Sequence, residues 1–371
     1  MKPPAVTLDT ELRQTASSHA GEASLSASSQ LLGPTTAGES ANLDLLRSTA
    51  VLCVVVGHFF ASAGLPFPRN WSFFGVILFF IHTSFVLMGS LARLEVTGFT
   101  RPWPLALGFM IRRIFRIYPL SILFVLLVPV FSVPHFPGEA YAWVGWPAFL
   151  SNLAITQNLT KARVVLAPLW TLPVEVQMYC VLPFLYMGLR GGRYRSFIFW
   201  VLAVLAALTI PTIFLGRLNI FLYAPCFVAG IVAFELSKVS SKRLPAWLWP
   251  VTLALVIAAW TPFGNANFMA EIHRAWIFAL ALAVLVPQFR EITMPALARP
   301  AHLIAKYSYG LYLSHVVIYW LAIDRMRHFP LGLRILVGTI GIVAVPVGVF
   351  HLVEDPCIKV GARYAAHLRR R

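Results

Sequence analysis

Charged residues are scarce in this chain of 371 residues: they make up 12% of it, and only 14 residues are acidic. A soluble domain carries roughly twice that charged share, because water must solvate its surface. Hydrophobic residues reach 58%. These proportions exclude an ordinary soluble globular protein and indicate a chain that is solvated mostly by a lipid bilayer.

Cysteine is equally sparse, with four residues, and no two of them have CxxC spacing. We therefore expect neither a disulfide framework nor a metal site. The 30 lysines and arginines could indicate a nucleic-acid partner, but they stand in short clusters between apolar runs. That arrangement is typical of cytoplasmic loops in membrane proteins, so we expect no nucleic acid. No P-loop occurs in a usable context, which argues against an ATP-driven pump.

The chain divides into three parts by composition. Residues 1–41 are rich in Ser, Ala, Thr and Gly without a sustained apolar run, which predicts a disordered N-terminal tail. Residues 42–357 carry the long apolar runs and are predicted to form one transmembrane domain. Residues 358–371 form a basic C-terminal tail.

The predicted fold class is all-α, a polytopic membrane protein with about ten transmembrane helices and both termini in the cytoplasm. The apolar runs lie at 45–64, 71–92, 116–133, 168–188, 196–215, 219–237, 246–262, 273–289, 303–323 and 332–354. The shorter piece 141–157 is ambiguous. If it does not cross, most loop lysines and arginines fall on the cytoplasmic side, as the positive-inside rule demands.

The first run contains Arg47 and His58, eleven residues apart. In a helix they share nearly the same face and lie roughly 16 Å apart along the axis. His58 would then lie near the middle of the membrane, where an ionisable residue is costly and commonly functional. A histidine that only hydrogen-bonds a neighbouring helix is the alternative.

Arginines also stand where the third run begins, and Arg113 and Arg116 share a helix face. Most loop arginines only anchor topology, but a pair of them can grip phosphate groups bidentately. Together with Arg47 they are predicted to converge at the cytoplasmic mouth of the bundle. There they could bind phosphate groups.

Further polar side chains interrupt three other runs. Glu175 is the clearest acid within the membrane, and Tyr179 follows it by one turn. Such a carboxylate either serves catalysis or transport, or pairs with a buried arginine. A stripe at a spacing of three joins Tyr309, Tyr312 and His315, and His82 is a further polar residue in the second run.

Together these motifs resemble the acyltransferase 3 family of integral-membrane acyltransferases, over residues 43–357. The matching positions are Arg47 with His58; Arg113 and Arg116 before Tyr118-Pro119; Trp170, Thr171, Leu172, Glu175 and Tyr179; Tyr309, Tyr312 and His315; and Glu354-Asp355-Pro356. The second run departs from the family, with Ile77 in place of an acid and Ser84 in place of a glycine.

The resemblance implies O-acylation, most often O-acetylation, of a carbohydrate or lipid-linked glycan in the inner membrane of a bacterium. The donor would be cytoplasmic acetyl-CoA or another acyl-CoA, with no permanently bound cofactor. Its phosphates would bind Arg47, Arg113 and Arg116. His58 is predicted to act as general base or acyl carrier. Glu175 is predicted to orient it, as the third member of a catalytic triad does. Tyr179, Tyr309, Tyr312, His315 and His82 would line the site.

Two alternatives remain open from sequence. The first is a secondary transporter in which Glu175 and His58 form a proton relay. The second keeps the enzyme class and changes the acceptor to a small secreted molecule such as a macrolide.

Overall fold

The computed structural model describes residues 40–66, 70–189, 193–213, 220–240, 243–263 and 267–368. Within these ranges the chain is helical, with no β-strand and one isolated bridge between Leu244 and Phe289. The predicted all-α class is therefore confirmed for the described residues. The predicted tail of residues 1–41 lies almost wholly outside them, as do the last three residues.

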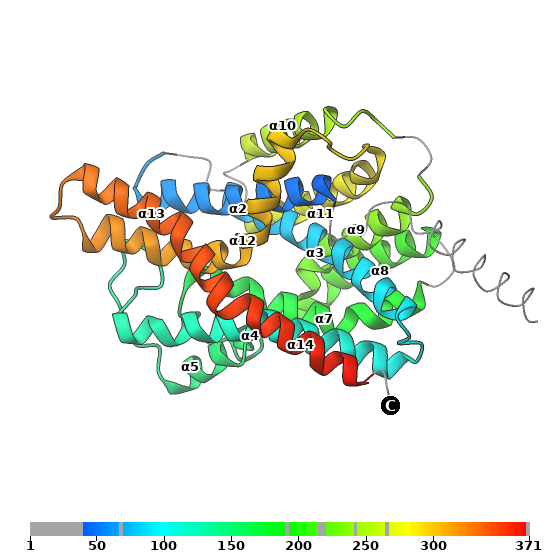
Figure 1. The fold of residues 1–371 in the computed structure, drawn as a ribbon, viewed down its shortest axis with the longest axis horizontal. Helices are drawn as coiled ribbons and strands as arrows, with labels where there is room; N and C mark the ends of the chain where they lie inside the picture. The colour runs from blue at the N-terminus through cyan, green and yellow to red at the C-terminus, as the bar shows by residue number, and fades with distance from the viewer. Residues whose placement is uncertain are drawn as a thin grey trace, which may run out of the picture. The chain divides into compact units, whose positions relative to one another are not determined.

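Thirteen α-helices and five short 3₁₀ or π segments make up this part of the chain (Figure 1). The α-helices are α2 (Ala41–Ser62), α3 (Asn70–Val96), α4 (Pro102–Phe131), α5 (Trp146–Leu153), α6 (Gln157–Thr160), α7 (Leu172–Gly188), α8 (Arg193–Ile213), α9 (Ile220–Ser237), α10 (Leu248–Trp260), α11 (Phe268–Leu285), α12 (Pro295–Tyr319), α13 (Leu331–Val349) and α14 (Asp355–Leu368). The short segments are η1 (Ala167–Thr171), η2 (Thr261–Phe263), η3 (Val286–Gln288), η4 (Trp320–Arg325) and η5 (Phe350–Glu354), of which the last two are π-helical.

Each of the ten apolar runs overlaps one of the helices of the structure. Six helical segments among the described residues are long and apolar enough to cross a membrane by length and composition. The helix α12 has 25 residues but is less apolar along its length, because it carries the polar stripe that includes Tyr309 and His315. The count of ten crossings and the cytoplasmic placement of both ends stay predictions.

The ambiguous piece 141–157 contains only the eight-residue helix α5 and the first residue of α6. Eight residues span about 12 Å, which is too short for a hydrocarbon core of about 30 Å. The segment folds back on itself, since the Asn152 amide donates to Ala148 O and Arg163 O. As a helix, it cannot cross alone.

Two glycines fix the contact between α2, which carries Arg47 and His58, and its neighbour α3. A Cβ atom at Gly57 would clash with Ser72, and one at Gly75 would clash with the carbonyl of Ala50. Small residues of this kind let two membrane helices approach closely. The helix α2 also packs on α12, so both α3 and α12 hold it in place.

The chain continues as a helix beyond the last apolar run, through residue 368. The π-helical turn η5 ends at Glu354, and α14 begins directly at Asp355 with Pro356 as its second residue. Proline is tolerated there because the first turn of a helix needs no N–H partner. The helix α14 runs along α4 (Figure 1), and Tyr364 stacks on Phe115 at a centroid distance of 5.8 Å. Residues 358–368 of the predicted basic tail therefore belong to a packed helix.

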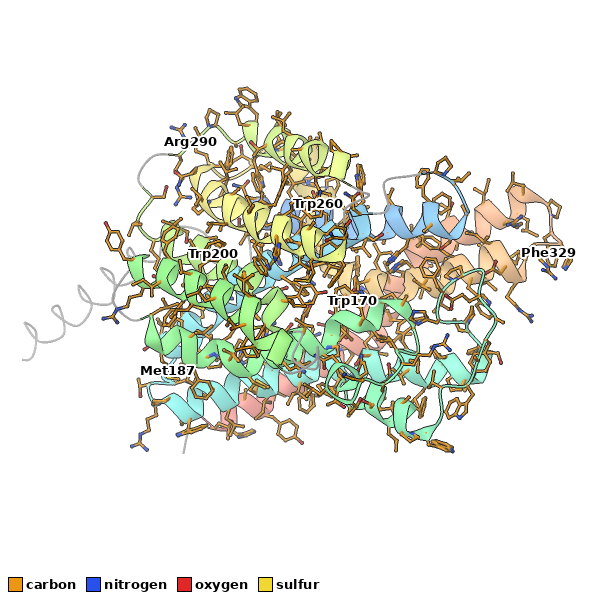
Figure 2. All side chains as sticks on the ribbon, turned by 180° about the vertical axis from the view of Figure 1, so that it is seen from behind. Trp170, Met187, Trp200, Trp260, Arg290 and Phe329 are labelled. Carbon is orange, nitrogen blue, oxygen red and sulfur yellow. The ribbon has the colours of Figure 1, made fainter. Side chains whose placement is uncertain are left out.

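Apolar side chains project outward from much of the described surface (Figure 2). Along α13 nearly every apolar side chain is half-exposed or exposed, Pro346 being the buried exception. Trp260, in contrast, is fully buried and stacks on Phe74 of α3. Such a surface suits contact with lipid rather than water.

Candidate active site

A pocket lies between α2, α3, α4, α7 and α12 and contains most of the predicted site residues. It holds about 670 Å³ of free space, part of which is open to the surroundings. Eight of the predicted residues line it: Arg47, His82, Arg113, Arg116, Glu175, Tyr179, Tyr309 and Tyr312. Segments more than 250 residues apart in sequence thus meet at one place.

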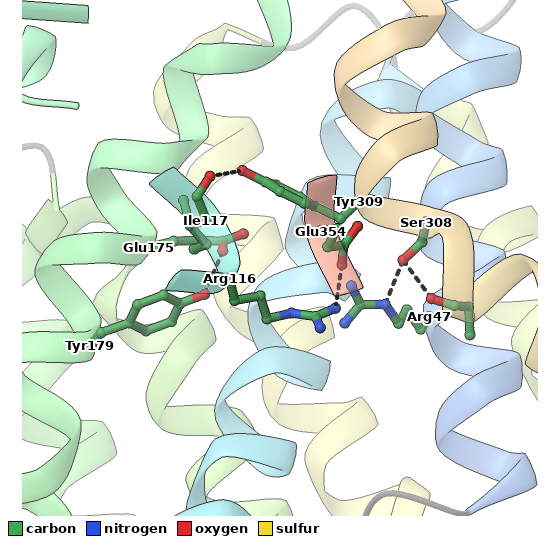
Figure 3. Close-up of polar contacts among 9 residues, drawn as sticks. Arg47, Arg116, Ile117, Glu175, Tyr179, Ser308, Tyr309 and Glu354 are labelled. Atoms are coloured by element: carbon green, nitrogen blue, oxygen red, sulfur yellow. Dashed lines mark hydrogen bonds and ion pairs between the residues drawn. The ribbon is translucent and has the colours of Figure 1, made fainter. Parts of the chain in front are cut away.

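The first arginine, Arg47, comes from the second turn of α2. Its Nε donates to Ser308 Oγ at 2.6 Å, and Ser308 in turn donates to the carbonyl of Ala305 (Figure 3). The start of α2 is itself fixed, since the Asn42 amide donates to Arg290 O and accepts from the Ile292 amide. The position of Arg47 is therefore set by α12 and by the segment that precedes α12.

Arg113 and Arg116 reach the same pocket from α4. Arg116 forms an ion pair with Glu354 at 3.3 Å (Figure 3), and the Glu354 side chain is fully buried. Arg113 makes no hydrogen bond or ion pair within the described residues, and its guanidinium lies over the Phe109 ring at 5.7 Å. The three guanidinium groups keep many unused donors, which is the condition for binding an anion.

Glu175 lies in the first turn of α7, after the 3₁₀ turn η1 and just behind Pro173. A helix N-terminus favours a carboxylate at that position. Its Oε2 accepts the hydroxyl proton of Tyr179 at 2.7 Å (Figure 3). No hydrogen bond joins Glu175 to His58 in the described part of the chain, so the expected direct contact between carboxylate and imidazole is not made.

The tyrosines of the predicted stripe tie α12 to its neighbours. Tyr309 donates to the carbonyl of Ile117 on α4 at 2.8 Å (Figure 3). Tyr312 hydrogen-bonds Pro168 O and Thr171 Oγ1 in η1. Both hydroxyls are thereby held by the protein, so these residues shape the wall of the pocket.

His82 lines the pocket from α3, and its buried Nδ1 has no hydrogen-bond partner among the described residues. The two departures from the family pattern lie elsewhere. Ile77 is fully buried, and Ser84 donates to carbonyls of its own helix, where it contacts Gly230 of α9. Neither residue lines the pocket, so both act in helix packing.

His58 and His315 lie outside the pocket wall and contact each other. His58 Nδ1 is 2.8 Å from His315 Nε2, and the two rings are nearly parallel, with centroids 5.1 Å apart. Tyr312 connects this pair to the pocket, because it lines the pocket and its ring lies 6.1 Å from His315. On the other side, the edge of Phe136 contacts His58 at 5.6 Å.

The sequence reasoning missed three residues of this arrangement, Ser308, Thr171 and Glu354, as contributors to the site. Ser308 and Thr171 position Arg47 and Tyr312. Glu354 compensates the charge of Arg116. Two signals pointed to Glu354: its place in the matching Glu354-Asp355-Pro356 motif, and its position as an acid at the end of a long apolar run, where such a residue requires a partner.

Comparison with known proteins shows the family to which this chain belongs. The acyltransferase domain family matches residues 40–351. The chain belongs to this family. Nodulation protein 10 of Rhizobium leguminosarum bv. viciae is 24% identical to this acyltransferase family member over 376 residues, which cover 89% of this chain and 97% of that protein. No solved structure matches this chain. The apolar helices and the family together make it a multi-pass membrane protein.

The described residues of this acyltransferase contain no group of three or more His, Cys, Asp or Glu side chains that could hold a metal ion. The four cysteines, all described, are unpaired. The polar groups that converge are guanidinium, imidazole, carboxyl and phenol. These can bind anions and move protons.

The role of Glu175 can be tested by kinetics. We expect Glu175→Gln to keep kcat within about tenfold, because the amide oxygen can still accept from Tyr179 and no contact with His58 is lost. Its KM for the acyl donor should stay equal or fall, since the pocket loses a negative charge beside three arginines. A kcat loss of about 100-fold or more at constant KM would return Glu175 to the catalytic role predicted from sequence.

Proposed function

We propose that this protein is a membrane O-acyltransferase that moves an acyl group, in the simplest case acetyl, from cytoplasmic acyl-CoA to a hydroxyl of a carbohydrate or lipid-linked glycan. The observation that carries the proposal is that a pocket lined by three arginines and a pair of histidines share the helices α2 and α12. We place the protein in the inner membrane of a bacterium.

The donor's phosphates would bind Arg47, Arg113 and Arg116. These arginines outnumber the two carboxylates nearby, Glu175 and Glu354. Arginine suits phosphate because its planar fork donates two parallel hydrogen bonds. His82 supplies a further unused nitrogen in the wall of the same pocket.

The distance along α2 fits the shape of such a donor. Eleven residues separate Arg47 from His58, which is about 16 Å of helix rise. An extended pantetheine arm has a similar length. The nucleotide could therefore stay among the arginines while the thioester passes Tyr312 and reaches the histidine pair.

His58 would then take the proton of the acceptor hydroxyl. The acceptor oxygen forms a bond to the thioester carbonyl carbon, the carbon–sulfur bond breaks, and the departing CoA thiolate takes up the proton. A positioned base of this kind typically contributes about 10²–10⁴-fold in rate. An acyl-histidine intermediate gives the same products in two steps.

A transporter with a Glu175–His58 relay is less well supported. The two side chains have different partners in the structure, Tyr179 for Glu175 and His315 for His58. Both sequence alternatives can be separated from the proposal in one experiment.

That experiment uses the full chain, purified in detergent and reconstituted in vesicles with [¹⁴C]acetyl-CoA and a membrane glycan fraction. We expect CoA thiol release that depends on the acceptor, with label in an alkali-labile ester of the glycan. Label in a small hydroxylated molecule alone would change the acceptor. Movement of an intact solute without CoA release would instead show a transporter.

A further inference from the structure

We propose that His315 is a positioning residue that fixes the tautomer of His58, so that Nε2 of His58 is the nitrogen that accepts the proton. This inference rests on the proposed function, in which His58 takes the proton of the acceptor hydroxyl. It assigns the role that Glu175 was expected to fill to a neutral imidazole from α12. The hydrogen bonds that support it run from the Leu311 carbonyl to His315 and from His315 to His58.

The backbone carbonyl of Leu311 determines which nitrogen of His315 carries a proton. Nδ1 of His315 lies 3.2 Å from Leu311 O. A carbonyl oxygen can only accept, so Nδ1 must be the donor. A neutral imidazole has one N–H, and Nε2 of His315 is therefore left with a lone pair and can only accept.

The accepting nitrogen of His315 in turn determines which nitrogen of His58 carries a proton. Nδ1 of His58 lies 2.8 Å from that accepting Nε2, so Nδ1 must carry the proton. The remaining nitrogen of His58, Nε2, is unprotonated and available as a base. Partners that fix a histidine tautomer by binding its second nitrogen are a general device in catalytic and metal sites.

The surroundings hold the two rings in this geometry. His315 is completely buried, and the planes of the two rings differ by 6°. Tyr319 packs edge-on against His315 at 5.8 Å, and its hydroxyl donates to Val55 O on α2. This bond joins α2 to α12 one turn from the histidine pair, so the rings have little freedom to turn.

The carboxylates of Glu175 and Asp324 have other partners than the histidine pair. Glu175 accepts from Tyr179, and Asp324 accepts from the backbone amide of Gly138. When His58 takes up the acceptor's proton, its Nδ1–H still points at a lone pair of His315. The hydrogen bond to His315 can then stabilise the positive charge on His58.

Two substitutions separate the tautomer role from packing. His315→Gln places a carboxamide oxygen where Nε2 stood, and this oxygen can accept from His58 Nδ1–H. His315→Phe keeps the ring and the volume but offers no acceptor. We expect kcat to fall about 100-fold in His315→Phe and about tenfold or less in His315→Gln. KM for acetyl-CoA should stay within about threefold in both.

His302→Phe serves as the matched control, because it makes the same exchange on α12 at an exposed imidazole that pairs with Asp44 and does not line the pocket. Its kcat should stay within about threefold of the wild type. Equal losses in His315→Gln and His315→Phe would overturn the proposal. So would wild-type kcat in His315→Phe.

A second readout does not depend on turnover. ¹⁵N-histidine NMR of the full chain in bilayers, with the His58 signals identified by their absence in His58→Gln, should show Nδ1 protonated and Nε2 bare. His315→Phe should shift His58 toward the other tautomer. An unchanged His58 spectrum in His315→Phe would overturn the proposal even in an active enzyme. Absence of any CoA release by the wild type, with the spectra as expected, would contradict the proposed function alone.

Discussion

His58→Ala is expected to insert into the membrane normally and to lose acyl transfer by about 10²–10⁴-fold, the range that a positioned base contributes. The side chain is half-buried near the end of α2, and among the described residues its only side-chain hydrogen-bond partner is His315. Folding should therefore survive the change. CoA release in the presence of acceptor measures the loss, and the affinity for acetyl-CoA should stay near the wild-type value.

His302→Ala is the matched control. His302 lies near the start of α12, where its exposed ring pairs with Asp44 at 2.8 Å, away from the pocket. An exposed pair of this kind contributes little to stability, so activity should be unchanged. If His58→Ala keeps most of its activity while His302→Ala behaves as the wild type, His58 is structural and the proposed chemistry is wrong.

Hydrophobic runs predicted the existence of the long helices but not their ends. Helix α4 begins at Pro102, although the apolar run begins at 116. Its first turns carry arginines that lower the hydropathy without disturbing the helix. Helix α14 was missed altogether, because its apolar contacts recur once per turn among charged residues. A search for long apolar runs detects helices that lie in lipid. The start of α4 and helix α14 are instead amphipathic and pack one face on a neighbouring helix.

The sequence predicted which residues belong to the site, but it did not predict which of them contact one another. An ionisable side chain in an apolar run is costly wherever it lies, and this alone identified His58, Glu175 and His315. Which of them touch depends on which helices are neighbours. His58 and His315 are 257 residues apart, and helical periodicity fixes only the face of each helix. For the same reason the sequence did not predict the ion pair of Arg116 with Glu354.

The arginines of the pocket should control donor binding, and Arg113 gives the cleanest test. Arg116→Ala would leave Glu354 buried without its cation, a change that typically costs about 3–5 kcal/mol of folding stability. Arg47→Ala would leave Ser308 without its partner. Arg113 has no such partner among the described residues, so its replacement removes donors from the pocket and little else.

We expect Arg113→Ala to weaken acetyl-CoA binding about 100-fold and Arg113→Lys about tenfold. A hydrogen bond to a charged group is worth about 1.5–3 kcal/mol, and lysine keeps the charge but not the fork. Isothermal titration calorimetry on the detergent-purified protein measures both. Arg112→Lys is the matched control, because Arg112 is adjacent in sequence but does not line the pocket. It should bind as the wild type does.

Titration with acetyl-dephospho-CoA, which lacks the 3′-phosphate, sharpens the result. If Arg113 grips that phosphate, Arg113→Lys should bind this analogue as tightly as the wild type does. If the arginine grips the pyrophosphate, the tenfold difference should persist, because the two contacts are then independent and their free energies add. Equal affinities for acetyl-CoA in the wild type, Arg113→Ala and Arg112→Lys would show that Arg113 anchors topology and binds no donor. The half-buried place of Arg113 on the pocket wall, where its guanidinium has no carboxylate partner among the described residues, argues for the first outcome or the second.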